Sequence, residues 1–179
     1  MIESSAWPPY FGNVAGFYNS LEPFLAQGVK NIEWATAKNC VMVGGKDSGI
    51  EYYPTNKDAI EIVIKIDFPK IGKSECGFSL PKDQELLKTA FKAPTLGWPP
   101  HLYPISKFFR YFGWEHHNKI AWLQNHSSRE LLEIIILHRL GDLAGAWSTL
   151  CHKRLVGGVI ISNKAGHRLD LKLIKAVEI

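Results

Sequence analysis

The sequence is poor in cysteine and has no long hydrophobic run. Its three cysteines, Cys40, Cys76 and Cys151, are odd in number and widely spaced, which is typical of reduced thiols in a cytoplasmic protein and argues against a disulfide framework. No apolar run approaches the roughly 18–20 residues that a membrane-spanning helix needs, so we expect no membrane contact. The first residues also lack the basic segment and apolar stretch of a secretory signal.

The common catalytic motifs are absent as well. The chain contains no GxSxG, GxGxxG, HExxH or CxxC motif. The loop Gly44–Gly49 has its glycines and lysine in the wrong order for a phosphate-binding loop. The adjacent His116 and His117 lack the grouped spacing of zinc ligands. We therefore expect a protein that binds rather than catalyses, without a metal or a cofactor.

One catalytic alternative stays open. Glu61 and Lys65 share one face of a predicted strand, but they lie two residues too far apart for the ExK motif of restriction-type nucleases. A metal-dependent hydrolase or nuclease would instead need scattered acidic and imidazole groups that converge on one cleft. The candidates for such a cluster are Glu61, Asp67, His116, His117 and His126.

The composition describes a folded domain. The 179 residues are 46% hydrophobic and 21% charged, with a net charge of +4. This apolar fraction excludes a disordered chain, and the length fits one domain. We expect a single domain over residues 1–179, in which residues 1–13 form an N-terminal arm. The weak positive charge permits a phosphate-bearing ligand without requiring one.

Hydrophobic periodicity predicts the secondary structure. Ile60–Phe68 alternates apolar and polar side chains, which predicts a strand with one packed face. Ser127 and Glu130 form a capping box ahead of an apolar helix over Leu131–Leu140, with Gly141 as its stop. The other predicted elements are a hairpin of Ile32–Val43 with Ile50–Tyr53, a helix over Pro81–Lys92, a strand over Lys119–Gln124, a further helical turn or two within Asp142–Cys151, and a hairpin of Leu155–Ser162 with His167–Ile174. Together they predict the α+β class, with a curved, mainly antiparallel sheet and helices packed on one face.

Trp114 and Glu115 form the pair with the most specific chemistry. An indole face stacks on nucleobases, which is worth about 1–3 kcal/mol per base in single-strand binders. A carboxylate beside it accepts N–H groups from the edge of the base. Lys164 and Arg168, on the predicted C-terminal hairpin, would then hold phosphates. On spacing alone, the alternative is that Trp114 caps the core and Glu115 is a solvated charge.

Four stretches of the chain follow one another in the order found in a known protein family. Trp114–Trp122 contains Trp-Glu followed by Asn and Trp, and Leu131–Asp142 is the apolar helix with Gly-Asp at its end. Val156–Ser162 and His167–Leu171 are the strands of the predicted C-terminal hairpin. They resemble the translation initiation factor 4E family, the mRNA cap-binding proteins. The resemblance implies a curved sheet backed by helices.

The resemblance also implies a site and a ligand. In it, Trp114 would stack on a methylated guanine, Glu115 would bind the N–H edge of that base, and Lys164 and Arg168 would hold the cap phosphates. The partner would be RNA or a guanine nucleotide, and the role would lie in translation in the cytoplasm. The family's second stacking aromatic has no clear counterpart; the candidates are Phe68, which is nearest by spacing, and Tyr52 or Tyr53.

The aromatic residues of a proline-rich loop and of the N-terminal arm predict a different function. The segments Pro94–Tyr103 and Ser5–Phe11 combine proline with aromatic side chains of the kind that anchor interfaces. A protein-interaction module, such as an inhibitor, an immunity protein or a structural subunit of a larger complex, is therefore the alternative to nucleotide binding. Its interface candidates are Trp98, Tyr103 and Trp7.

Overall fold

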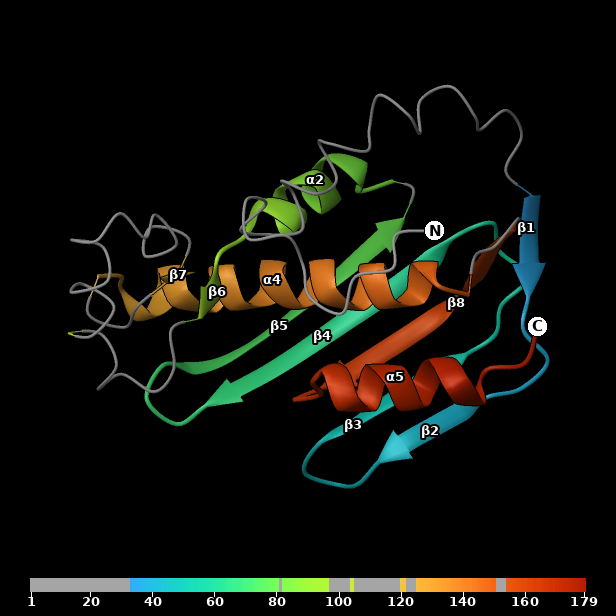
Figure 1. Cartoon of the computed structure of the whole chain (residues 1–179), viewed down its shortest axis with the longest axis horizontal. Helices are drawn as coiled ribbons and strands as arrows, with labels where there is room; N and C mark the ends of the chain where they lie inside the picture. Colours follow the sequence, from blue (N-terminus) through green and yellow to red (C-terminus); the bar gives the residue numbers. More distant parts are fainter. Residues whose placement is uncertain (1–32, 81, 97–103, 105–119, 122–124, 151–153) are drawn as a thin grey trace.

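A mixed sheet of six strands, with three helices packed against it, makes up the part of the chain that the structure describes (Figure 1). The structure is a computed structural model, and it describes residues 33–80, 82–96, 104, 120–121, 125–150 and 154–179. The strand pairs are mostly antiparallel. The α+β class, with helices on one face of a mainly antiparallel sheet, is confirmed.

The strand β8 lies at the centre of the sheet. The order across the sheet is β2-β3-β8-β4-β5, and β1 pairs with the beginning of β8. β8 runs antiparallel to β3 but parallel to β4 and β1. The strands are β1 (Glu33–Thr36), β2 (Val41–Gly44), β3 (Gly49–Tyr53), β4 (Ile60–Phe68), β5 (Gly72–Leu80) and β8 (Arg154–Asn163). Two short strands, β6 (Thr95–Leu96) and β7 (Ile120–Ala121), pair with each other in parallel.

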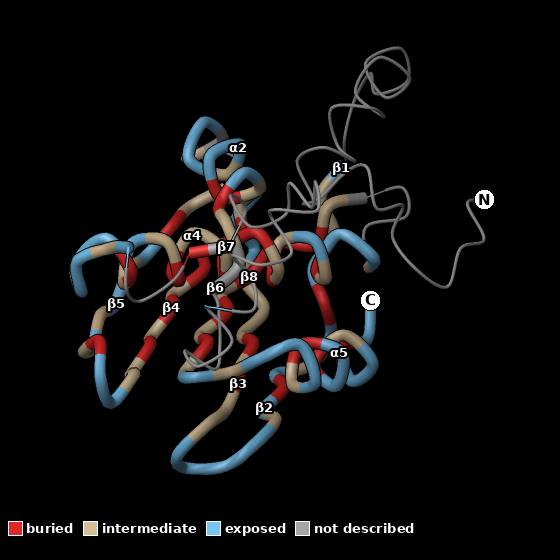
Figure 2. The backbone as a smooth tube through the Cα atoms, turned by 60° about the vertical axis from the view of Figure 1, so that its left-hand side comes forward, coloured by how far each residue is buried: buried red, intermediate tan, exposed pale blue. Residues whose placement is uncertain are grey.

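The helices cover one face of this sheet. They are α2 (Gln84–Lys92), α4 (Ser128–Ser148) and α5 (His167–Ala176). α4 lies across β4 and β5, α5 lies over β2 and β3, and α2 packs beside α4 (Figure 1). The buried residues gather where the sheet faces α4 and α5, whereas the outer sides of α2 and α5 are exposed (Figure 2).

The strand β4 confirms the predicted period of two. It has the predicted bounds, and its isoleucines at positions 60, 62, 64 and 66 are all buried against the helices. The alternate residues, among them Lys65 and Asp67, point to the opposite face of the sheet. The predicted β2–β3 hairpin is also confirmed, but Ile32–Val43 is not one strand. It spans β1 and all but the last residue of β2, and β1 pairs with β8 instead of continuing into the hairpin.

The helix α4 confirms the capping box and corrects the predicted stop. The Ser127 hydroxyl accepts a hydrogen bond from the Glu130 backbone N–H at 3.3 Å, and a Glu130 carboxylate oxygen accepts one from the Ser127 N–H at 2.7 Å. The helix does not end at Gly141 but continues to Ser148. A Cβ at Gly141 would lie 3.1 Å from the carbonyl oxygen of Ala90 in α2. The glycine therefore allows two helices to approach closely, and it does not terminate one.

The second strand of the predicted C-terminal hairpin is wrong, because His167–Ala176 forms the helix α5. Leu169, Leu171 and Leu173 alternate in the sequence, as the apolar residues of a half-buried strand do. The folded chain instead buries positions spaced by three and four residues, Asp170, Leu173 and Val177, and leaves Leu171 58% exposed. The strand β8 is present, but it is followed by a helix that folds back over the sheet.

Tyr52 and Trp147 fill the space above a glycine pair in β8. Their rings are 4.9 Å apart between centroids. The Tyr52 hydroxyl donates to the Gly157 carbonyl at 2.7 Å, and the Trp147 indole N–H donates to the Val156 carbonyl at 3.0 Å. Gly158 has φ +148, and a Cβ there would collide with the Tyr52 ring. Burial raises the pKa of the Tyr52 phenol. Tyr52 is thus a core residue and not a stacking surface for a ligand.

Candidate functional site

A polar hollow opens at the end of β4, where this strand meets β5 and β8. It has a volume of about 400 Å³. Three lysines and two carboxylates line it, so its side chains carry a net charge of +1. The lining residues are Lys65, Ile66, Asp67, Lys73, Ser74, Glu75, Asn163 and Lys164. We call this set the polar hollow.

Strand register brings these side chains together. Across the β4–β5 pair, Lys65 lies opposite Glu75 and Asp67 lies opposite Lys73, while Lys65 also neighbours Asn163 of β8. Lys65 and Asp67 alternate with buried isoleucines. The polar hollow therefore opens on the face of the sheet that α4 and α5 do not cover.

The lysines of the polar hollow share its two carboxylates. The Lys65 ammonium lies 3.3 Å from a Glu75 carboxylate oxygen. One oxygen of Asp67 lies 3.3 Å from the Lys73 ammonium and 3.6 Å from the Lys164 ammonium. These are partly exposed pairs, which contribute only about 0–1 kcal/mol each. An incoming anion can therefore compete for the lysines at low cost.

Lys164 is held in place by its backbone. It has φ 48, the one positive φ of a non-glycine residue in the described ranges. Its N–H donates to the Lys65 carbonyl at 2.8 Å, and its carbonyl accepts a hydrogen bond from the Ser48 hydroxyl at 2.9 Å. The strand β4 and the β2–β3 turn thus fix the left-handed turn that follows β8, and this turn directs the lysine toward Asp67.

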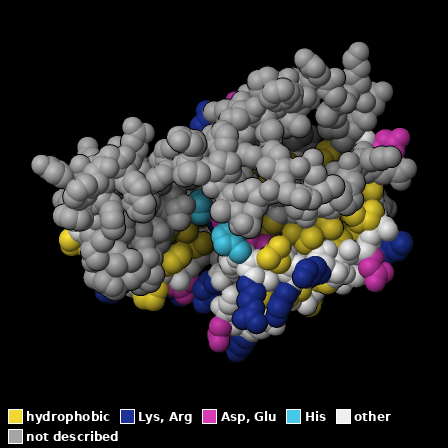
Figure 3. Space-filling view, in the orientation of Figure 1, with side chains coloured by type: hydrophobic (Ala, Val, Ile, Leu, Met, Phe, Trp, Pro, Cys, Tyr) yellow, Lys and Arg dark blue, Asp and Glu magenta, His cyan; other side chains and the backbone are white. Residues whose placement is uncertain are grey.

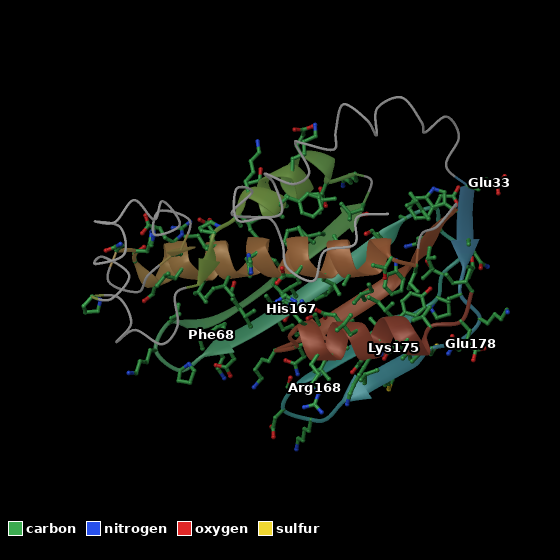
Figure 4. The ribbon with its side chains drawn as sticks, viewed as in Figure 1. Glu33, Phe68, His167, Arg168, Lys175 and Glu178 are labelled. Carbon is green, nitrogen blue, oxygen red and sulfur yellow. The ribbon has the colours of Figure 1, made fainter. Side chains whose placement is uncertain are left out.

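The other predicted residues with described positions lie elsewhere. Arg168 is exposed in the first turn of α5, on the helix side of the sheet (Figure 4). Phe68, at the end of β4 (Figure 4), is half-buried and packs against the hydrophobic core. Of the alternatives to Phe68, Tyr53 is half-buried, and strand alternation places it on the open face of the sheet. Its hydroxyl donates to Glu51 at 2.7 Å, and this bond raises the pKa of its phenol.

The remaining candidates fall outside the described residues. These are the predicted base-binding pair, Trp114 and Glu115, and the predicted interface residues, Trp98, Tyr103 and Trp7. Their roles stay predictions. The polar hollow itself could not be found from the sequence, because three of its eight lining residues come from β5, which we did not predict. The strand β5 has the polar sequence GKSECGFSL and so lacks the apolar alternation that revealed β4.

A buried ion pair between α4 and α5 was not predicted from the sequence either. Both terminal nitrogens of Arg139 donate to the carboxylate of Asp170, one of them at 2.6 Å, and one also lies 3.3 Å from the Ser162 hydroxyl. All three residues are buried. The signal in the sequence was an arginine within an apolar helix, but its partner lies 31 residues away.

Three of the five candidates for a metal-dependent site, Glu61, Asp67 and His126, lie within the described residues and form no cluster there. No group of three potential ligands comes together among them. Glu61 pairs with Lys57 at 3.1 Å, whereas Asp67 lies six residues along the same strand, about 20 Å away. His126 precedes α4, and His116 and His117 lie outside the described residues. The described helices include none that is long and apolar enough to span a membrane.

No protein-family model matches the chain, and no curated protein matches it. The chemistry of the site therefore rests on its own residues. Of the four stretches that resemble the initiation factor 4E family, His167–Leu171 forms part of the helix α5 and not the strand that the resemblance implies.

Proposed function

We propose that the protein is a non-catalytic binding protein for a phosphate-bearing nucleotide, with an RNA end of the cap type as its ligand. The observation that carries this proposal is the position of Lys164. It is fixed by its backbone beside Lys65 and Lys73 at one open polar hollow. Lysine ammonium groups donate charge-assisted hydrogen bonds to phosphate oxygens, and the volume of the hollow falls within the roughly 300–1,000 Å³ that is typical of ligand pockets.

The polar hollow supplies the phosphate part of such a site. A phosphate group that enters it meets three ammonium groups and replaces the weak contact of Lys164 with Asp67. In the proposal, Trp114 stacks on the base and Glu115 accepts hydrogen bonds from its edge, as the resemblance to the cap-binding family implies. Phe68 is not a second stacking residue in the proposal, because it packs against the core on the side away from the polar hollow.

We place this function in the cytoplasm. Cys40 is exposed and Cys76 is half-buried, and both are free thiols. An exposed free thiol is typical of a reducing compartment. The same compartment holds the RNA ends and nucleotides that the proposal requires.

The test is a titration with 7-methylguanosine triphosphate, followed by the quenching of tryptophan fluorescence and by calorimetry. We expect saturable binding that the Lys164→Ala variant weakens by about tenfold, because one charge-assisted hydrogen bond is lost. The matched control is Lys57→Ala, which removes another exposed lysine that is paired with a carboxylate of β4. The absence of binding at millimolar nucleotide, or an equal loss in both variants, would contradict the proposal.

A further inference from the structure

The outer face of α5 carries a row of cations. Arg168, Lys172 and Lys175 are all exposed, at spacings of four and three residues. Such spacings place them on one side of a helix, about 6 Å and 4.5 Å apart along its axis. Figure 3 shows lysine and arginine side chains gathered over this helix. We call these three residues the basic face of α5.

No carboxylate of α5 offsets this charge. The helix has a single acidic residue, Asp170, and it points inward to the buried ion pair with Arg139. Within the described residues, no acidic side chain lies within ion-pair distance of the basic face; this includes Glu178, just beyond α5, and Asp47, in the β2–β3 turn. The nearby Asp142 of α4 is instead placed between His138 and His167, at 3.5 Å and 3.6 Å.

The basic face begins where the polar hollow ends. Lys164 lines the polar hollow, and α5 starts after Gly166, two residues further along the chain. Arg168 follows in the first turn of the helix. The cations therefore continue from the hollow, around the end of the sheet, onto the outer side of the helix layer. Their spacing along α5 is comparable to one nucleotide step of a single strand.

We propose that the basic face of α5 is a second binding site, which holds the backbone phosphates of a single-stranded RNA. The inference rests on the proposed function, since the RNA end would occupy the polar hollow and the chain that follows it would run along α5. The site takes the phosphate backbone and no particular base, because its described side chains offer cations without an aromatic platform. A membrane surface fits less well, since Leu171 is the one strongly exposed apolar side chain on α5 and interfacial helices present a broad apolar face.

The rigidity of α5 supports this role. The Asp170 carboxylate and the fully buried Leu173 anchor the helix to α4 and the sheet. The Asn39 side chain holds its C-terminal end, by donating to the Ala176 carbonyl at 3.0 Å and accepting from the Glu178 N–H at 3.0 Å. A fixed helix thus presents the three cations. The binding of a phosphate chain therefore costs little conformational entropy in the backbone of α5.

The experiment compares two ligands and two double variants of the full chain. The ligands are 7-methylguanosine triphosphate and an eight-nucleotide RNA with the same cap. The test variant is Lys172→Ala/Lys175→Ala on α5. The matched control is Lys88→Ala/Lys92→Ala, which removes two exposed lysines at helical spacing from α2. Circular dichroism shows whether each variant is folded, and anisotropy gives the affinity at several salt concentrations.

We expect the wild-type chain to bind the capped RNA about tenfold more tightly than the nucleotide, and the α5 variant to lose that gain. The slope of log K against log salt for RNA should become shallower by about 1.4 in this variant, as two single-strand phosphate contacts are lost. Nucleotide binding should not change, and the α2 control should behave as the wild-type chain.

Other outcomes separate the two proposals. Equal affinity for nucleotide and RNA would overturn the α5 site and leave the polar hollow in place. RNA binding that depends on α5 without any nucleotide binding would support the α5 site and overturn the proposed function. Binding to anionic lipid vesicles that the α5 variant abolishes, with no preference for RNA, would assign the basic face to a membrane and overturn the inference.

Discussion

Arg139 of α4 and Asp170 of α5 form a buried, two-pronged ion pair that fixes α5 over the sheet. The Asp170 side chain is 1% exposed and that of Arg139 is 9% exposed. By turning the one carboxylate of α5 inward, this pair both anchors the helix and leaves its outer side purely basic. The stability of the helix layer and the charge of its surface thus depend on the same contact.

Removal of Asp170 should destabilise the protein strongly. Asp170→Ala leaves the Arg139 guanidinium buried without its partner, which costs about 3–5 kcal/mol. Unfolding in urea, followed by circular dichroism, measures the loss. The double variant Arg139→Met/Asp170→Leu should recover most of it, because no buried charge remains. A single variant within about 1 kcal/mol of the wild-type chain would show that this pair does not hold α5 in place.

Gly158 should tolerate no side chain. Its φ of +148 and the collision of an added Cβ with the Tyr52 ring mean that Gly158→Ala strains the backbone and displaces a buried aromatic pair. We expect a loss of about 3 kcal/mol or more in the free energy of unfolding. Gly77→Ala is the matched control, since nothing lies within 4 Å of a Cβ at that position of β5. Similar melting temperatures for the two variants would contradict this account of β8.

The capping box of α4 should weaken in acid. Hydrogen bonds from the Ser127 backbone and hydroxyl hold the pKa of the Glu130 carboxyl below its ordinary value of 4.5. A carboxyl group with a lowered pKa in the folded state adds stability that is complete above its unfolded pKa and is lost as the pH falls through the folded value. The difference in melting temperature between the wild-type chain and Glu130→Ala should therefore shrink below about pH 4.5. A difference that stays constant or grows in acid would refute this.

Removal of Asp67 should strengthen the binding of phosphate. Asp67 shares one oxygen between Lys73 and Lys164, so Asp67→Asn leaves both lysines free for a ligand. Because exposed pairs are worth about 0–1 kcal/mol, we expect up to about fivefold tighter binding of 7-methylguanosine triphosphate. Glu61→Gln, at the other end of β4, removes a similar pair with Lys57 and should have no effect. Weaker binding by Asp67→Asn would mean that the carboxylate itself contacts the ligand.

The sequence predicted the elements whose patterns are purely local. Alternating isoleucines determine β4, and a capping box ahead of an apolar run determines the start of α4. The prediction failed where one segment fits both the period of a strand and the period of a helix. Leu169, Leu171 and Leu173 fit a strand, but the segment is a helix that buries Asp170 against Arg139 of α4. Contacts between distant segments decide such cases, and a single sequence does not reveal them.

The candidate site was predictable only in part, because contacts between distant segments bring its residues together. Lys164 and Arg168 were found as basic residues near the end of β8, and the structure places Lys164 in the polar hollow. Lys73 was missed, because it lies on the polar edge strand β5. Arg168 was expected beside Lys164 on a hairpin, and the helix places it on the other side of the sheet.

The most direct test of the account is a titration of isotope-labelled protein with 7-methylguanosine triphosphate, followed by backbone amide shifts in nuclear magnetic resonance spectra. We predict saturable shifts at the residues of the polar hollow, above all at Lys65, Lys73 and Lys164, while the amides of α2 stay unchanged. Shifts that are absent at millimolar nucleotide, or that cluster away from the polar hollow, would contradict the proposal that this hollow holds the phosphates.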